Sequence, residues 1–239
     1  KTQTGKLAYA FIDGNGNTDR CVGVYVPGEG TPTWRCYKST NLSNIANQDV
    51  VLYVWGDLPE EVEYESYRVS NYVLTHETAT TDEYTVVTSN TTTLSTGTYV
   101  VNSTVINNNQ IRVADNAEVN LILCDGASLT ASKGIVCNEG TKLNIFGQSA
   151  GTGELIATAS TNCAAIGGEY TETTYQHKNG YITIHGGKIT ATGVDHTPGI
   201  GASNWSSGGM ITILNGNITA TAGYGAAGIG GSEYGVGGT

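Results

Sequence analysis

Aromatic side chains recur at one position in the repeating half of the sequence. Three rings each stand four or five residues after an isoleucine that is followed by glycine: Tyr170, Trp205 and Tyr234. They lie in polar loops rich in Gly, Ser, Asn and Glu, and Tyr175 lies in the first of these loops. An aromatic face beside hydrogen-bonding side chains is the chemistry that holds a sugar ring. The predicted ligand-binding residues are therefore Tyr170, Tyr175, Trp205 and Tyr234, and the predicted partner is a glycan or a cell-surface polysaccharide.

A structural interpretation of the same rings stays open. Large side chains that project from polar loops can simply cover those loops and shield the turns beneath them from water. Only the relative positions and the exposure of the rings can separate the two interpretations.

Paired carboxylates would instead indicate a sugar-cleaving enzyme. Such enzymes place two carboxylates about 5 to 9.5 Å apart on either side of one glycosidic bond. Asp125 and Asp195 fall at different turns of the repeat, and Glu118, Glu139 and Glu154 do not share one position. The sequence therefore predicts no carboxylate pair.

Basic and nucleophilic side chains give no stronger indication of catalysis. Arg112 is the single arginine after residue 98, and no acidic cluster adjoins it or the lysines in the sequence. His185 precedes two glycines and is interpreted as a partly covered turn residue, while His177 and His196 lie in loops without an evident Ser or Cys partner. We assign no catalytic residue. A polysaccharide lyase or glycoside hydrolase is the alternative function, and a structural stalk or filament subunit is the second alternative.

Metal and cofactor sites are not predicted either. The segment "DGNGNTD" at residues 13–19 resembles a calcium loop, but Thr18 and Val24 stand where such a loop needs Gly and Glu. A hairpin turn is the preferred interpretation. The five cysteines form no CxxC pattern and are expected to be free and mostly buried, with a Cys21–Cys36 bridge as the chief exception.

Composition and charge narrow the class of protein. Of the 239 residues 33 are Gly and only 13% are charged, which suits short strands joined by many turns. The formal net charge of -10 argues against nucleic acid and anionic lipid as partners. No stretch is apolar for the roughly 18 residues that span a bilayer, so membrane insertion is not expected.

A repeat of 29 residues sets the geometry on which these side chains depend. Residues 181–203 and 210–232 are identical at 12 of 23 positions. The repeated isoleucines are Ile182, Ile184, Ile189 and Ile200, which return as Ile211, Ile213, Ile218 and Ile229. Repeats of this length that contain several very short strands are typical of a β-solenoid, in which each repeat forms one coil and the coils stack.

The apolar pattern extends toward the N-terminus with variable spacing. Leu155 lies 34 residues before Ile189, and Leu143 lies 39 residues before Ile182. Leu121 and Leu143 are matched at a spacing of 22. We interpret the length differences as insertions in loops, which leave the strand pattern intact.

Alternation along the strands assigns side chains to two faces. Successive side chains of a strand point to opposite faces, and neighbouring strands lie about 4.8 Å apart, so like residues stack in columns. The residues predicted to point inward are Ile182, Ile184, Ile189 and Ala191. Those predicted to point outward are Thr183, Thr190 and Thr192. Glycines beside Ile166, Ile200 and Ile229 are interpreted as sharp corners rather than as a phosphate site.

Three segments follow from these patterns. Residues 1–75 are predicted to form a small antiparallel β-sandwich-like domain, because short alternating runs are separated by turn sequences such as "DGNGN" and "PGEG". Residues 76–98 are a Thr-rich connector or a first irregular coil, and residues 99–239 are a parallel β-helix. Because the chain stops inside "YGVGGT", which elsewhere introduces a coil, we expect further coils, other domains or self-association at that end.

The motif order from Tyr99 onward resembles that of a known group of modules. "VNLILCDGASLTASKGIVCNEGTKLNIFGQSAGTGELIAT", followed by "AAIGG", "ITIHGGKITATG" and "GIGG", is similar to right-handed parallel β-helix modules in large modular surface proteins of gut-dwelling anaerobic bacteria. The leading segment more weakly resembles a small β-sandwich module found beside them. The resemblance implies a pectin-lyase-like fold, an extracellular location at the cell surface or in secreted form, and an adhesive or carbohydrate-binding role.

Overall fold

The computed structural model describes residues 60–170, 178–206 and 208–233, together with the backbone of three short strands nearer the N-terminus. The chain divides into two compact units, Lys1–Leu58 and Pro59–Thr239. This division lies before the hairpin of residues 62–81, whereas the sequence pattern suggested a change near residue 75.

The first unit contains an antiparallel sheet of three strands in the order β1-β2-β3. These strands are β1 (Ala10–Phe11), β2 (Arg20–Tyr25) and β3 (Thr33–Lys38). The turn sequences "DGNGN" and "PGEG" lie between successive strands, as hairpin signals do. Cys21 lies opposite Tyr37 and Cys36 lies opposite Val22. Of the rest of the predicted sandwich, residues 60–75 are described and belong to the second unit, and the other residues lie outside the described part of the chain.

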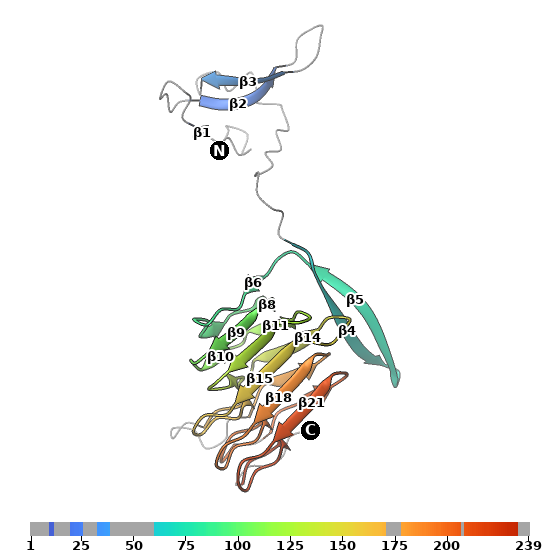
Figure 1. The fold of residues 1–239 in the computed structure, drawn as a ribbon, viewed down its shortest axis with the longest axis vertical. Coiled ribbons are helices and arrows are strands. Elements are labelled where there is room, and N and C mark those ends of the chain that lie inside the picture. The colour runs from blue at the N-terminus through green and yellow to red at the C-terminus, as the bar shows by residue number, and fades with distance from the viewer. Residues whose placement is uncertain are drawn as a thin grey trace. The chain divides into compact units, whose positions relative to one another are not determined.

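The second unit is built on three parallel sheets (Figure 1). Sheet I contains β6 (Thr85–Val86), β8 (Gly97–Val101), β11 (Glu118–Leu123), β14 (Lys142–Gly147), β17 (Tyr181–Ile184) and β20 (Ile211–Ile213). Sheet II contains β9 (Thr104–Asn107), β12 (Ser128–Ala131), β15 (Glu154–Thr158), β18 (Lys188–Thr192) and β21 (Asn217–Thr221). Sheet III contains β7 (Thr93–Leu94), β10 (Ile111–Val113), β13 (Ile135–Val136), β16 (Ile166–Gly167), β19 (Ile200–Gly201) and β22 (Ile229–Gly230).

From β8 onward the chain visits the three sheets in a fixed cycle. One passage through sheets I, II and III is called a coil, and each coil adds one strand to every sheet beside the strand of the coil before it. The described residues form strands, turns and bridges without a helix, so no helix among them is long and apolar enough to cross a membrane. This all-β arrangement of parallel sheets is consistent with a parallel β-helix.

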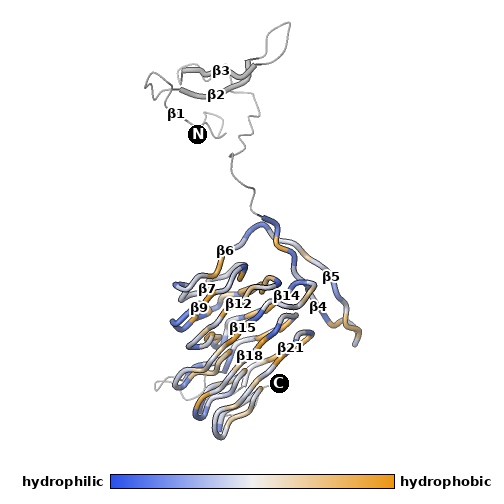
Figure 2. The backbone as a smooth tube through the Cα atoms, in the orientation of Figure 1, coloured by the Kyte–Doolittle hydropathy of each residue, from blue (hydrophilic) through white to orange (hydrophobic). Residues whose placement is uncertain are grey.

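The predicted stacking of the 29-residue repeats is confirmed. Ile189 lies opposite Ile218 in sheet II, and Ile200 lies opposite Ile229 in sheet III. The side chain of Ile189 is fully buried, and it belongs to a core that runs through all the coils. Hydrophobic stretches accordingly recur along the strands of successive coils (Figure 2). The outward assignment of Thr183, Thr190 and Thr192 is also confirmed, since each is only half-buried.

One predicted register is wrong. The spacing of 22 matched Leu121 with Leu143, but Leu143 pairs with Val119, and Leu121 pairs with Ile145, a spacing of 24. A shift of two residues keeps every side chain on its own face of the strand. The apolar pattern alone therefore cannot distinguish the two alignments.

The glycine corners of sheet III have a steric cause. Gly167 and Gly201 have φ values of +143° and +142°, which side chains rarely adopt. A Cβ placed on Gly167 would lie 2.0 Å from the carbonyl oxygen of Gly201 on the next coil. Tight stacking of the coils thus requires glycine at this corner, and no ligand is needed to explain it.

A long hairpin precedes the coils and covers the outside of sheet I. It consists of β4 (Val62–Ser70) and β5 (Val73–Thr81), paired antiparallel over their whole length. Val62 packs on an outward apolar column made by Val100, Ile122 and Phe146, one residue from each of three successive coils. The hairpin residues, which the sequence pattern divided between a sandwich-like domain and a connector, therefore form a cover for the sheet.

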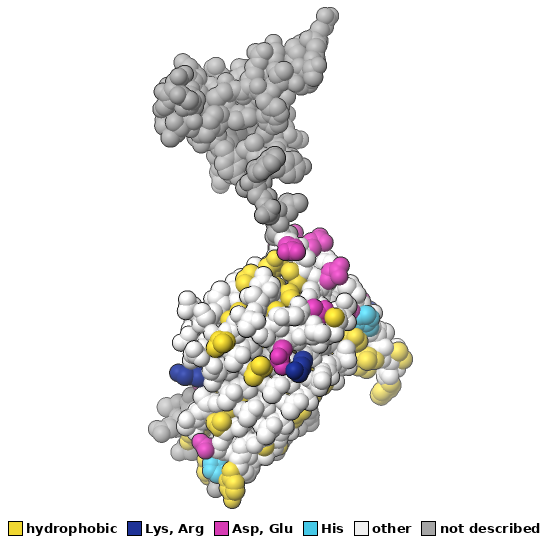
Figure 3. All heavy atoms as spheres, in the orientation of Figure 1, with side chains coloured by type: hydrophobic (Ala, Val, Ile, Leu, Met, Phe, Trp, Pro, Cys, Tyr) yellow, Lys and Arg dark blue, Asp and Glu magenta, His cyan; other side chains and the backbone are white. Residues whose placement is uncertain are grey.

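The tip of the hairpin extends beyond this covered column. Its exposed apolar side chains are Val69, Tyr72, Val73 and Leu74. They form the yellow group on the projecting edge of the molecule in Figure 3. Residues 85–98, after the hairpin, supply β6, β7 and the start of β8, which begin sheets I and III.

Truncation of a stacked isoleucine tests the core. Ile189→Ala is expected to lower the free energy of unfolding by about 2 to 5 kcal/mol, because it removes buried methyl groups and leaves a cavity between coils. Ile106→Ala is the matched control, since Ile106 is 58% exposed on the outside of sheet II and should change stability by less than about 0.5 kcal/mol. Chemical denaturation measures both. Equal losses in the two variants would contradict the assignment of faces.

Candidate functional site

Two of the four predicted aromatic residues lie in the described part of the chain. Tyr170 and Trp205 lie in loops that follow sheet III on adjacent coils, and the strands before these loops pair in register, Ile166 opposite Ile200. Tyr170 is half-buried and Trp205 is 47% exposed. Tyr175 and Tyr234 lie outside the described residues.

Trp205 has an uncommon backbone conformation. Its φ is +58°, in the left-handed region that bulky residues seldom occupy. Around it the chain is fixed: the Ser206 amide donates to the carbonyl of Ser203 at 3.1 Å, and the Ser232 hydroxyl donates to the same carbonyl at 2.9 Å. The Ser203 hydroxyl in turn donates to the carbonyl of Asn162. A residue that combines a strained backbone with an exposed aromatic side chain is a feature that recurs at binding sites.

Charged side chains near these loops are paired across coils. Arg112 donates through both terminal nitrogens to Glu169, with one contact of 2.6 Å, and the Asn138 amide donates to the same carboxylate at 3.1 Å. Hydrogen bonding to Glu169 raises the pKa of Arg112, although partial burial opposes the shift. Arg112, which had no evident acidic neighbour in the sequence, therefore has one in the fold.

Two lysines are also paired with glutamates on neighbouring coils. Lys142 pairs with Glu118 at 2.9 Å, and Lys188 pairs with Glu154 at 2.8 Å, in each case across adjacent strands of one sheet. Exposed pairs of this kind contribute little to stability, but they set charges of opposite sign side by side as the coils stack.

The surroundings of Cys137 and Asp125 in the fold shift the pKa values of both side chains. Burial raises the pKa of the Cys137 thiol to about 11, although hydrogen bonds with Thr141 and Gly180 oppose the shift. A thiol that stays protonated is a poor nucleophile. Burial would raise the pKa of Asp125, but hydrogen bonds from Thr152 and Ala150 outweigh it and lower that pKa. Asp125 thus fixes the loop after β14.

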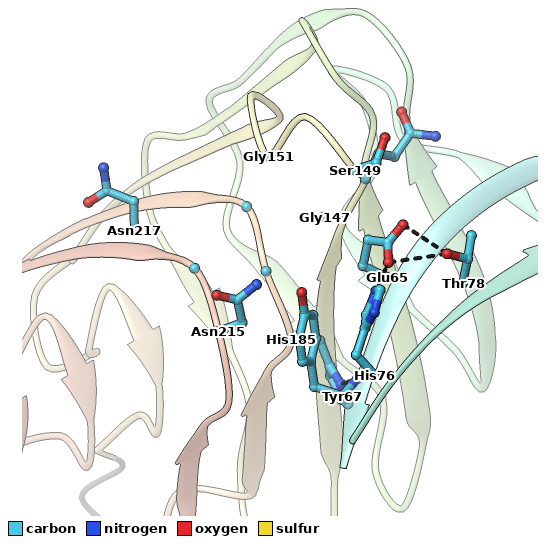
Figure 4. Close-up of a pocket in the computed structure, with 14 residues that line it drawn as sticks. Glu65, Tyr67, His76, Thr78, Gly147, Ser149, Gly151, His185, Asn215 and Asn217 are labelled. Atoms are coloured by element: carbon cyan, nitrogen blue, oxygen red, sulfur yellow. Dashed lines mark hydrogen bonds and ion pairs between the residues drawn. The ribbon is translucent and has the colours of Figure 1, made fainter. Parts of the chain in front are cut away.

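A cleft lies between the hairpin and the corners that join sheet I to sheet II (Figure 4). Its volume is about 520 Å³. One wall is the hairpin, with Glu65, Tyr67 and His76. The opposite wall comes from the corners of three successive coils, with His185 and Asn215 among its residues.

Glu65 is the most constrained group on the hairpin wall. The Glu65 residue is 8% exposed, and its carboxylate forms an ion pair with His76. The Thr78 hydroxyl donates to it at 3.2 Å (Figure 4). The ring of Tyr67 lies against the ring of His76, with centroids 4.8 Å apart.

His185 ties the hairpin to the coils. Its Nδ1 accepts a hydrogen bond of 3.0 Å from the backbone amide of Tyr67, and its ring stacks on Phe146 with centroids 4.3 Å apart. Nearby, the Gln148 amide donates to the carbonyl of Glu63 at 2.8 Å. Burial lowers the pKa of His185, although the Tyr67 hydrogen bond opposes the shift. The interpretation of His185 as a covered turn residue agrees with this burial, but the cover comes from an unforeseen element.

This cleft was not predicted from the sequence. Glu65 and His76 lie 11 residues apart on two strands of a hairpin, whereas His185 comes more than 100 residues later. The alternation of apolar and polar residues in 62–81 was a signal for the hairpin itself. Nothing in the sequence says which coils the hairpin covers.

No protein-family model matches the chain, and no curated protein or solved structure shows significant similarity to it. The geometry of the described residues is therefore the basis for a functional proposal.

Acid should loosen the hairpin through His185. A proton on Nδ1 would turn the acceptor of the Tyr67 hydrogen bond into a donor, so the fold favours the neutral ring and lowers its pKa. The stabilisation is complete above the ordinary histidine pKa of 6.5 and is lost as the pH falls through the lower folded value. The free energy of unfolding should therefore decrease between about pH 7 and pH 5.

His185→Asn is the control for this pH dependence, because its side-chain oxygen can accept from Tyr67 but does not titrate in this range. Denaturation of both proteins across the same pH range isolates the contribution of His185 from that of the Glu65–His76 pair, which both retain. Identical pH slopes in the two proteins would show that His185 does not carry the effect.

Proposed function

We propose that the chain is a non-catalytic adhesion or carbohydrate-binding module of an extracellular bacterial surface protein. In this proposal the parallel sheets form a right-handed parallel β-helix of the pectin-lyase-like kind, and a glycan binds an aromatic strip along one edge. The resemblance in motif order to surface-protein modules supports the fold and the location.

The observation that carries the proposal is the exposure of Trp205 on a fixed turn. The ring is 47% exposed, and the hydrogen bonds around Ser203 hold its backbone in a left-handed conformation. Folding alone gains little from a strained turn that leaves a large apolar ring in water. A ligand that covers the ring would recover that apolar area.

Tyr170 gives the strip its second ring. It follows Ile166 at almost the same place as Trp205 follows Ile200, and these two isoleucines are direct neighbours in sheet III. Glu169, beside Tyr170, makes this loop polar, and its carboxylate is held by Arg112 and Asn138. Aromatic faces flanked by polar groups match the alternating apolar faces and hydroxyl groups of an oligosaccharide.

Pairing of the basic side chains favours binding over bond cleavage. Arg112, Lys142 and Lys188 each hold a glutamate on another coil, so each has a structural role that explains its presence. To act as a base in polysaccharide cleavage, any of these three side chains would have to leave its pair before it could accept a proton.

Removal of the exposed ring tests the site. Trp205→Ala should reduce binding to glycans on an array at least about tenfold, because stacking and apolar contact on one ring contribute of the order of 1 kcal/mol or more. Tyr72→Ala is the matched control: Tyr72 is also exposed and also has a left-handed φ, of +63°, but lies at the hairpin tip. Unchanged binding by Trp205→Ala would refute this site.

Incubation with polysaccharides separates binding from catalysis. Pectins, mucin glycans and hemicelluloses should bind or fail to bind without chemical change. Chromatography and ultraviolet absorbance would detect new reducing ends or unsaturated products, respectively. Turnover that persists in a highly purified sample would replace the proposal with the enzymatic alternative.

A further inference from the structure

We propose that the cleft between the hairpin and the coil corners is a second ligand site, and that it takes one neutral sugar unit. It is distinct from the Trp205 surface, because its wall follows sheet I whereas Trp205 follows sheet III. The carrying observation is a histidine in the cleft wall whose Nε2 donor has no acceptor among the described residues.

His185 presents that donor to the cleft. Its Nδ1 accepts from the Tyr67 amide, so the hydrogen of the neutral ring is on Nε2. The residue is 9% exposed and lines the cleft. No residue in the described part of the chain accepts a hydrogen bond from Nε2. This donor faces the cleft, where a ligand oxygen can accept its hydrogen bond in place of water.

Other polar groups converge on the same space. The Glu65 carboxylate receives hydrogen bonds from His76 and Thr78 and keeps acceptor capacity for a hydroxyl group. Asn215 and Asn217 lie at the corner of the last described coil, and neither side-chain amide has a hydrogen-bond partner among the described residues. Acceptors and donors therefore face one another across the cleft (Figure 4).

The charges of the lining select a neutral ligand. Among the described residues no lysine or arginine lines the cleft, and the Glu65 carboxylate is paired with His76, so a phosphate, a sulfate or an acidic sugar would find no unpaired cation there. A metal ion is disfavoured because the described residues contain no group of three or more His, Cys, Asp or Glu able to hold one. The hydroxyl groups of a neutral sugar can accept hydrogen bonds from the donors of the cleft and donate hydrogen bonds to its acceptors.

The size of the cleft agrees with this class of ligand. A volume of about 520 Å³ lies within the range of small-molecule sites. Gly147, Gly186 and Gly187 line the cleft with backbone, and glycine at these positions lets neighbouring coils approach closely. The hairpin and the corners are both fixed by Gln148 and His185, which makes the cleft a preformed one.

Histidine side-chain NMR can test the inference directly. The chain labelled with ¹⁵N at histidine is titrated with a panel of methyl glycosides of neutral hexoses and N-acetylhexosamines, at millimolar concentrations. The His185 Nε2 resonance, assigned with His185→Asn, should shift and saturate with at least one of them. Methyl glucuronide, which adds only a carboxylate, should bind more weakly than methyl glucoside. No saturable shift with any neutral glycoside, or stronger binding of the glucuronide, would overturn the proposal.

Asn215→Ala and Asn102→Ala form a matched pair of variants. Asn102 is an exposed asparagine at the same corner of an earlier coil and does not line the cleft. Asn215→Ala should weaken the NMR-detected binding about tenfold, as expected for one lost hydrogen bond, while Asn102→Ala leaves it unchanged. Equal affinities in the two variants would place the ligand elsewhere.

The Trp205→Ala variant distinguishes this inference from the proposed function. It should lose glycan-array binding and keep the His185 response. Loss of both readouts would mean one site at Trp205 and would overturn the inference, whereas loss of the His185 response in Asn215→Ala alone supports two separate sites.

Discussion

In-register parallel pairing between successive coils is the constraint on which the rest of the second unit depends. Every inward isoleucine has another directly above or below it, as Ile189 has Ile218, and the core is continuous for that reason. The same register carries outward features from coil to coil at intervals of about 4.8 Å. Both proposed binding surfaces use this property, one at the loops after sheet III and one at the corners after sheet I.

Much of this architecture could be predicted from the sequence because burial imposes a strong pattern. The repeats at Ile182 and Ile211 gave the correct pairing, since strand faces and corner glycines recur together there. Near Leu121 and Leu143 the repeats differ in length, and an alternating pattern is unchanged by a shift of two residues. Hydrophobic periodicity determines which face a residue occupies more firmly than it determines which partner lies opposite.

The two candidate sites differ in how far the repeat pattern determines them. The place of Trp205 in a loop after sheet III could be predicted, because Trp205 belongs to the repeat and follows Ile200. The cleft was not, because it depends on how β4 docks on sheet I, through contacts such as that between the Tyr67 amide and His185. Those two residues are 118 positions apart in the sequence. A hydrogen bond that a backbone amide donates does not depend on the residue type and so cannot be recognised from the sequence. Sites made within a repeat are therefore easier to predict than sites made between a repeat and its cover.

The hairpin has a further consequence for how the molecule comes apart. Units of a repeat protein usually contact only their nearest neighbours, so such proteins can fray one unit at a time. Here a single strand, β4, packs on the apolar column of three coils through Val62 and bonds to a fourth at His185. Separation of any one of these coils would disturb contacts shared with the others. Cooperative melting of the four coils as a block, rather than progressive peeling from one end, is the behaviour that this shared cover imposes.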